Sequence, residues 1–394
     1  ALREPRTTGQ CADDRRNEAE HLVDGADLGR REAGAANQEG RRQASGEGVT
    51  ELVQHDHREQ CDCAIATEER IPRREERRKA RAARRLQRGD ACEPRASQLL
   101  TEKGYQCEYP EAQPFAICLT HDIDTVYRPI HSKSLEILSA LKNRDFARAG
   151  RIVPQLRSKK CPEWNFNEIA DLEESYGACS SFYFLALDDE DRNCTYAIED
   201  LEQEMCTLLD GGWEIGLHGG CEAYRDLEQL QREKRRLEKV LNQTVNGYRN
   251  HFLKFRVPDT WELLERAGFR YDTTLGYPDC TGFRNGMCHP FRPFNINTSR
   301  EMTILEIPLA IMDRTLLSFM RLNMEQAWTQ TERLLDTVER HNGVLTILWH
   351  NTFMTGAPLQ FYRKILEYGH EKGAWMASCK EIEAWWQKSG MQPP

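Results

Sequence analysis

From about residue 113 onward, short apolar runs of strand length alternate with longer amphipathic stretches of helical period. Strand-then-helix repeats connect parallel strands, so this alternation predicts an α/β fold with a parallel sheet. Such a sheet is either covered by helices on both faces or closed as a barrel. The predicted strands are Phe115–Thr120, Ser180–Leu187, Glu214–Leu217, Val245–Arg249, Arg270–Thr274, Thr303–Pro308 and Val344–Trp349. The predicted helices are Ser132–Leu141, Asn167–Tyr176, Ile198–Asp210, Tyr224–Leu241, Pro258–Ala267, Asn323–Glu339 and Leu359–Glu371.

Five of these strands end in ionisable or amide side chains. The residues are His121, Asp122 and Asp124 after the first strand, His218 after the third, Arg249, Asn250 and His251 after the fourth, Asp272 in the fifth, and His350 and Asn351 after the last. The carboxyl ends of parallel strands meet at one edge of the sheet, where α/β proteins bind their ligands. The sequence therefore predicts one polar site built from several strands.

The residue types at these strand ends are those of a divalent-metal site. Carboxylate and imidazole groups are ordinary ligands of zinc, cobalt and nickel. A metal with an open coordination position lowers the pKa of a bound water to about 7. A neighbouring carboxylate can then act as a base, and an opposed histidine can act as an acid.

The first part of the chain has a different composition. Residues 1–104 contain no Phe, Trp or Tyr, and they are rich in Arg, Ala and Glu. A segment of this kind buries too little apolar surface to offset the entropy of ordering it. We therefore expect residues 1–104 to be disordered or not native coding sequence, and residues 105–394 to form the folded domain. Within the first segment, helices are conceivable at Asp14–Val23 and Pro72–Arg88.

Composition narrows the classes of partner. The formal net charge of −9 argues against nucleic acid, because nucleic-acid-binding proteins carry basic surfaces. The chain has no apolar run of about 18 residues, so no membrane-spanning helix is expected. Its 14 cysteines are scattered and several lie in apolar contexts. This usage favours a reducing compartment over a disulfide framework, and hence a cytoplasmic location. The sequence gives no indication of oligomeric state.

The strand-end motifs, taken in order, resemble those of a known family. The segments "THDID", "GLHGG", "GYRNHF", "YDTT" and "LWHN" resemble the polysaccharide deacetylases, the NodB-homology group similar to carbohydrate esterase family 4. The resemblance covers Phe115 to Trp386, and the wording of the motifs is similar to an uncharacterised bacterial subgroup. It implies a distorted (β/α) barrel and a metal-dependent hydrolase that removes acetyl groups from N-acetylated sugars or polysaccharide.

The resemblance also implies roles for individual residues. Asp122 corresponds to the catalytic base, and Arg249 to the residue that orients it. His350 corresponds to the catalytic acid, and Asp272 to an acidic residue near that assembly. Asp124 and His218 correspond to metal ligands, with zinc the expected ion and cobalt or nickel as alternatives.

The third metal ligand is open, because the family's second histidine of the "GLHGG" motif is replaced by Glu222. Either His251 or Glu222 could take its place, and we favour His251. His121, Glu222, Tyr277 and Asn351 are the candidate substrate-binding residues. The alternative functions are a glycan-binding pseudoenzyme on the same barrel, which the replaced histidine would explain, and another amide hydrolase.

Overall fold

A computed structural model describes residues 90–127 and 163–389, together with six isolated positions between 137 and 150. The predicted helix Ser132–Leu141 falls largely outside these residues, as do the two helices considered at Asp14–Val23 and Pro72–Arg88. The prediction that residues 1–89 lie outside the folded domain also concerns residues that are not described.

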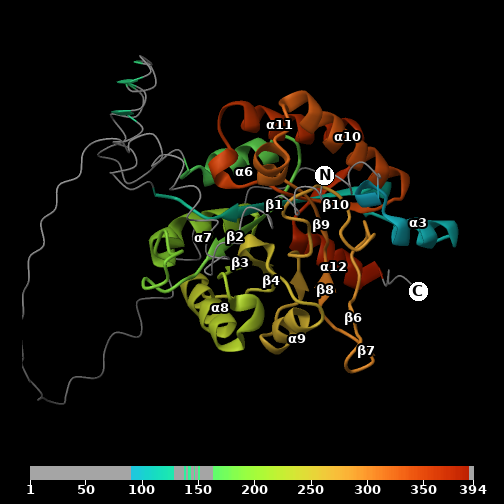
Figure 1. Cartoon of the computed structure of the whole chain (residues 1–394), viewed down its shortest axis with the longest axis horizontal. Helices are drawn as coiled ribbons and strands as arrows, with labels where there is room; N and C mark the ends of the chain where they lie inside the picture. The colour runs from blue at the N-terminus through green and yellow to red at the C-terminus, as the bar shows by residue number, and fades with distance from the viewer. Residues whose placement is uncertain are drawn as a thin grey trace, which may run out of the picture. The chain divides into compact units, whose positions relative to one another are not determined.

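The described residues form a parallel sheet whose strands follow one another around a distorted (β/α) barrel, which confirms the predicted fold class (Figure 1). The hydrogen-bonded order is β8-β5-β4-β3-β2-β1-β10-β9, and β11 pairs with β1 beside this path. The strands are β1 (Ala116–Ile123), β2 (Ser181–Leu185), β3 (Glu214–Gly219), β4 (Gly247–Asn250), β5 (Tyr271–Asp272), β8 (Leu305–Glu306), β9 (Leu309–Met312), β10 (Val344–Leu348) and β11 (Trp375–Ala377). A separate antiparallel pair joins β6 (Phe294–Asn295) and β7 (Arg300–Glu301).

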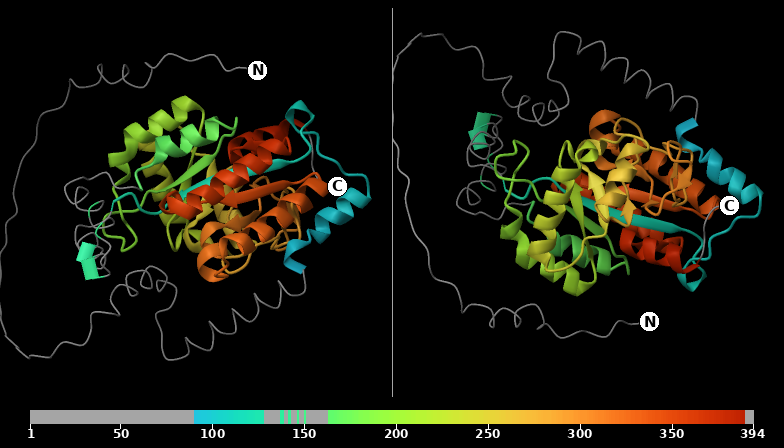
Figure 2. Two further views of the ribbon diagram at one scale, coloured as in Figure 1. Left: turned by 90° about the horizontal axis from the view of Figure 1, so that it is seen from above. Right: turned by 90° about the horizontal axis from the view of Figure 1, so that it is seen from below.

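Helices cover the outside of this sheet, as Figure 1 and the two views of Figure 2 show. They are α6 (Phe166–Glu174), α7 (Glu202–Gly211), α8 (Leu227–Leu241), α9 (Asp259–Arg266), α10 (Met324–Arg340), α11 (Gly356–Glu371) and α12 (Cys379–Ser389). Helix α12 lies at the amino ends of the strands, because its first backbone N–H groups donate to Ser181 Oγ and Glu214 Oε2. The opposite end of the sheet, where β1, β3 and β4 finish, is therefore the end left for a site; we call it the mouth. No described helix is both long enough and apolar enough to cross a membrane.

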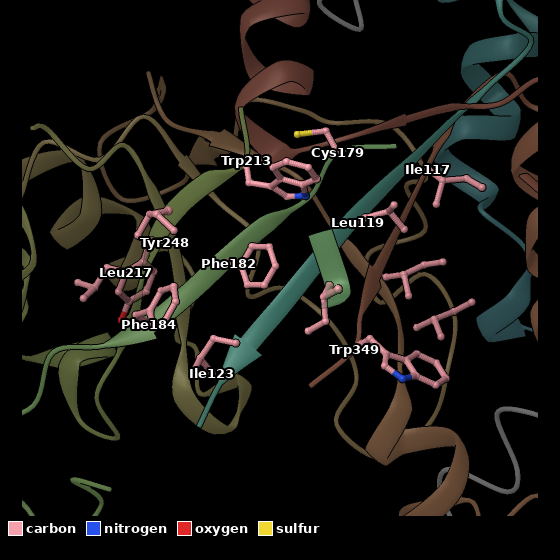
Figure 3. Packing of buried hydrophobic residues seen from close by; sticks show 14 of the residues in the cluster. Ile117, Leu119, Ile123, Cys179, Phe182, Phe184, Trp213, Leu217, Tyr248 and Trp349 are labelled. Carbon is pink, nitrogen blue, oxygen red and sulfur yellow. The ribbon is translucent and has the colours of Figure 1, made fainter. Parts of the chain in front are cut away.

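Side-chain alternation divides each strand between two environments. Along β1, Ile117, Leu119 and Ile123 belong to the layer between sheet and helices. The alternate residues Ala116 and Cys118 belong to a different cluster, which fills the inside of the barrel. Figure 3 shows the outer layer, where Phe182 and Phe184 of β2 lie beside Ile123 and Leu119 of β1. This alternation decides which strand-end residues reach the mouth.

The packed region begins before the predicted boundary at residue 105. Residues 90–104 contain the short 3₁₀ helix η2 (Asp90–Cys92) and the helix α3 (Arg95–Glu102). The side chains of Ala91, Cys92 and Ser97 are buried, and Ser97 Oγ lies 2.8 Å from His289 Nδ1. These contacts join a stretch without aromatic residues to the barrel.

Several elements of the described residues were not predicted from the sequence. Besides α3, β6 and β7, they include strands β9 and β11 and helix α12. Strand β9 follows β8 after only two residues, Ile307 and Pro308, so the sequence shows a single apolar run where the structure has two strands. The omission of β9 matters for the site.

Candidate functional site

Three predicted metal ligands lie together at the mouth. Asp124 follows β1, His218 lies near the end of β3, and His251 follows β4. One ligand atom from each lies within 4.8 Å of the other two. His218 Nε2 is 3.2 Å from Asp124 Oδ1, and His251 Nε2 is 3.6 Å from the same oxygen. One carboxylate and two imidazoles form a donor set suited to zinc and similar ions.

The atoms of this cluster fit a cation. Asp124 Oδ1 and His218 Nε2 are buried, and neither has a hydrogen-bond partner within the described part of the chain. His218 Nδ1 lies 3.1 Å from the carbonyl oxygen of Arg249, which can only accept, so Nδ1 carries the proton. The other nitrogen, Nε2, is thereby left to offer its lone pair toward Asp124. A buried donor set without partners is costly unless something binds it.

The pKa values of the cluster follow from burial and mutual charge. Burial raises the pKa of Asp124, but its interactions with the neighbouring side chains of His251, His218 and His350 outweigh this effect and hold the pKa well below its usual value. Burial lowers the pKa of His251 to about 4. His251 is therefore neutral near pH 7, which is the form that binds a metal.

Asp122 lies beside the cluster and inside the barrel. Its Oδ1 accepts a hydrogen bond from Arg249 Nη1 across 3.1 Å, and its Oδ2 lies 3.6 Å from His218 Nε2. Arg249 is itself fully buried and also donates to Thr120 Oγ1, Thr273 O and Thr273 Oγ1. One carboxylate oxygen is thus fixed by the guanidinium, while the other faces the metal cluster.

His350 lies on another side of Asp124, with Nε2 3.6 Å from Asp124 Oδ2. Its Nδ1 lies 2.7 Å from Oδ1 of Asp313, a buried residue that sequence reasoning missed. The Asp313 Oδ2 atom also accepts the backbone N–H of His350. Burial lowers the pKa of His350, but the charges of Asp313 and Asp124 raise it more, so the net shift is upward. Asp313 directly follows β9, so the strand-end signal applies to it once that strand is recognised.

Two predicted site residues point away from the mouth because of strand alternation. His121 is fully buried on the helix side of β1, where Nε2 lies 2.8 Å from Glu173 Oε1 and Nδ1 lies 2.7 Å from the carbonyl oxygen of Trp349. Asp272 also faces outward, opposite Glu306 of β8, and accepts a hydrogen bond from Thr274 Oγ1. The structure therefore does not bring His121 to substrate or Asp272 to the base Asp122.

The remaining candidates divide into two groups. Glu222 pairs with Lys254 and Arg225 at 2.7 and 2.6 Å and is not part of the metal cluster. Asn351 is buried and donates to the carbonyl oxygens of Thr125 and Glu163, which is a structural arrangement. Tyr277 lines an open cleft at the mouth, so it stays a candidate for substrate binding.

Comparison with known proteins agrees with these motifs. The chain is 31% identical over 134 residues to a peptidoglycan deacetylase-like protein of Gibberella zeae. The match covers 29% of this chain and 38% of the relative, so it spans about two fifths of that protein's length. No family model matches the chain.

Solved structures share the fold. A candidate polysaccharide deacetylase of Mycobacterium smegmatis superposes with a TM-score of 0.51 at 17% identity, over 73% of this chain and 96% of that one. A CE4 family pseudoenzyme of Bacillus anthracis gives a TM-score of 0.37 at 13% identity, over 70% of this chain and 66% of that one.

The partial match to the curated relative, the shared barrel and the order of the strand-end motifs support a NodB-type polysaccharide deacetylase family for this chain. Of the two residues considered for the third ligand position, His251 lies in the cluster and Glu222 does not. The fungal relative also leaves the expected bacterial origin untested.

The first prediction concerns the metal ligands. The full-length chain is expected to bind one equivalent of Zn²⁺ or Co²⁺, measured by elemental analysis and, for Co²⁺, by visible absorption. Replacing His251 by Ala should weaken metal binding by about a hundredfold or more. Loss of a residue that only hydrogen-bonds a ligand typically costs about 10–100-fold, and loss of the ligand itself should cost more. The matched control is Glu222→Ala, which should bind like the unaltered chain. Loss of metal in the Glu222 variant with retention in the His251 variant would reverse the assignment.

The second prediction concerns Glu173, whose carboxylate accepts from Tyr362, Ser180 and Trp213 in addition to facing His121. Burial raises the pKa of Glu173, but the charge and hydrogen bonds of these partners lower it below 4.5. A carboxyl with a depressed pKa in the folded state stabilises the fold above its unfolded pKa and loses this effect as pH falls.

Glu173→Gln should therefore lower the free energy of unfolding by about 3 kcal/mol at pH 7, and by less as the pH falls below about 4.5. Urea titrations across this pH range measure both values. The adjacent exposed Glu174 provides the control variant Glu174→Gln, which should change little. A pH-independent difference would show that the Glu173 charge is not involved.

Proposed function

We propose that this protein is a metal-dependent deacetylase that hydrolyses the acetamide bond of an N-acetylated sugar. The observation that carries the proposal is the placement of Asp122 and His350 around one Asp–His–His cluster. Each lies 3.6 Å from a member of that cluster, Asp122 from His218 and His350 from Asp124. Family membership supports the same reaction class.

Asp124, His218 and His251 would hold the cation. A bound divalent ion supplies Lewis acidity, which polarises a carbonyl group and makes water more acidic. The chain's contribution is to bring the two imidazoles and the carboxylate together among buried polar groups, and to orient His218 through the contact of its Nδ1 with the carbonyl oxygen of Arg249. The identity of the ion, with zinc favoured and cobalt or nickel as alternatives, is part of the proposal.

Asp122 is suited to act as the base. Arg249 holds one of its oxygens at 3.1 Å and compensates its charge inside the barrel. The free oxygen faces the cluster and can take the proton of the attacking water. Because the guanidinium fixes the carboxylate in one rotamer, this oxygen is oriented before substrate binds.

His350 is suited to act as the acid. Asp313 accepts the Nδ1 proton and stabilises the imidazolium form, so the Nε2 proton is available on the side facing Asp124. Transfer of that proton to the sugar nitrogen lets the amine leave as the carbon–nitrogen bond breaks. The base and the acid are thereby two different side chains, one oriented by Arg249 and the other by Asp313.

The third prediction tests the proposal directly. The metal-loaded chain should release acetate from N-acetylated oligosaccharides, and Asp122→Asn should reduce kcat by about 10²–10⁴-fold while metal content is unchanged. The control is Asp188→Asn, because Asp188 follows β2 but its side chain is 70% exposed. Saccharide binding without acetate release by the metal-loaded chain would instead support a glycan-binding pseudoenzyme.

The fourth prediction assigns the acid. Removing the Asp313 charge should lower the pKa of His350, so the alkaline limb of the pH–kcat/KM profile should move to lower pH in Asp313→Asn. At pH 7 the variant should lose about tenfold or more in kcat/KM. Asp336→Asn, a change on the surface of α10, is the control. A fall in rate with an unmoved alkaline limb would argue that Asp313 acts on structure rather than on His350.

A further inference from the structure

An open cleft of about 560 Å³ lies at the mouth beside the metal cluster; we call it the flanking cleft. Its walls come from the segments after β3, β4 and β5, namely Tyr224, Phe252–Phe255, Tyr277–Asp279 and Arg284. The Phe252 ring lines it and stacks on the His251 ring, with centroids 3.9 Å apart and planes 11° apart. The flanking cleft therefore lies directly beside the metal cluster, with Phe252 between His251 and the cleft.

The backbone at this junction is held in an unusual conformation. Phe252 and Leu253 have φ values of +61° and +51°, a region that bulky side chains rarely adopt. The Leu253 side chain is buried against Leu309, Met312 and Leu348, and this packing holds the turn. The sharp turn directs His251 to the metal cluster and Phe252 to the flanking cleft. Strain of this kind is typically retained where a site requires it.

The aromatic side chains of the flanking cleft suit a sugar ring. Tyr224, Phe252, Phe255 and Tyr277 are all partly exposed, so their faces are accessible from the cleft. Sugars present apolar C–H faces and hydroxyl groups, and half-buried aromatic rings with polar neighbours bind both.

The charges around the flanking cleft favour an acidic ligand. Lys254 and Arg284 line it, with Asp279 the carboxylate among the lining residues. Arg284 donates to the carbonyl oxygen of Gly276, and within the described residues it forms no ion pair with a carboxylate.

Arg284 is thus a guanidinium group that lines the flanking cleft without a carboxylate partner among the described residues, in a chain whose net charge is −9. Lys254, in contrast, is already paired with Glu222 across 2.7 Å. Guanidinium groups bind carboxylates through paired, charge-assisted hydrogen bonds. A ligand carboxylate would supply the partner that the protein itself does not.

We propose that the flanking cleft binds a carboxylate-bearing sugar unit next to the acetylated sugar, so that the substrate is an acidic N-acetylated polysaccharide. This inference rests on the proposed deacetylase function. Arg284 binds the carboxylate, and the aromatic residues bind the ring. The acetylated unit then lies at the metal cluster, on the other side of Phe252.

The test compares two substrates of equal length. One is a neutral oligomer of N-acetylglucosamine, and the other alternates N-acetylglucosamine with glucuronate. The metal-loaded chain should favour the acidic oligomer by about tenfold or more in kcat/KM. Arg284→Gln should remove most of this preference by slowing the acidic substrate more than the neutral one. Arg284→Lys should retain part of the preference.

The matched control is Arg256→Gln. Arg256 is exposed, lies next to the lining segment and pairs with Asp259 at 3.8 Å, outside the flanking cleft. This variant should keep the full preference for the acidic oligomer. An equal effect of Arg256→Gln and Arg284→Gln would overturn the assignment, because it would indicate a general surface-charge effect.

Binding of the acidic oligomer, measured by calorimetry without turnover, separates this inference from the proposed function. Binding that weakens in Arg284→Gln, with no acetate released, supports the flanking cleft and argues against deacetylation. The alternative outcome is acetate release from both oligomers at similar rates, with the acidic oligomer bound equally by the unaltered chain and by Arg284→Gln. That result supports deacetylation and overturns the assignment of the flanking cleft to a carboxylate-bearing sugar. Absence of both binding and release overturns both.

Discussion

The buried guanidinium of Arg249 is the interaction on which the site depends. Burial disfavours its charge, yet the charge of Asp122 and the surrounding groups hold the pKa of Arg249 above its usual value. Its nitrogens donate to residues on β1 and after β5, and it lies 4.9 Å from the ring of Tyr183 on β2. Breaking one partner of a buried ion pair leaves an uncompensated charge, which costs about 3–5 kcal/mol. Arg249 therefore joins β4, β1 and the segment after β5 inside the barrel, and the same contacts fix the base carboxylate. The stability of the barrel and the orientation of the base thus depend on one side chain.

Strand alternation explains why neighbouring residues in one motif serve different purposes. In "THDID", Asp122 points into the barrel toward Arg249, whereas His121 points outward to Glu173 on α6. The outward residue still affects the site, because its Nδ1 hydrogen-bonds the carbonyl oxygen that immediately precedes His350. One histidine thus links the strand that carries the base to the segment that carries the acid. It is a positioning residue, and its burial excludes contact with substrate.

Much of the fold and site was predictable from sequence, and the failures have physical causes. The apolar runs fixed the main strands, and the strand-end rule selected the metal cluster and His350. The same rule missed Asp313, because β8 and β9 are too close in sequence to be separated by pattern alone. The rule wrongly assigned Asp272 to the site, because it ignores the alternation of side chains along a strand. Thr273 faces Arg249 inside the barrel, so the preceding residue, Asp272, faces outward. The contrast between His251 and Glu222 could not be resolved from spacing, because it depends on the sharp turn at Phe252.

The two histidines on either side of Asp124 show how the surroundings assign different tasks to one residue type. His251 has its pKa lowered to about 4 by burial, whereas that of His350 is raised because Asp313 accepts its Nδ1 proton. Near neutral pH the first is a neutral ligand and the second holds a proton that it can donate. Divergent pKa values of neighbouring groups are what acid–base chemistry beside a metal requires. Asp313 raises the pKa of His350 and so contributes to this difference. It contacts His350 rather than the metal cluster, and it lies outside the motifs that identify the other site residues.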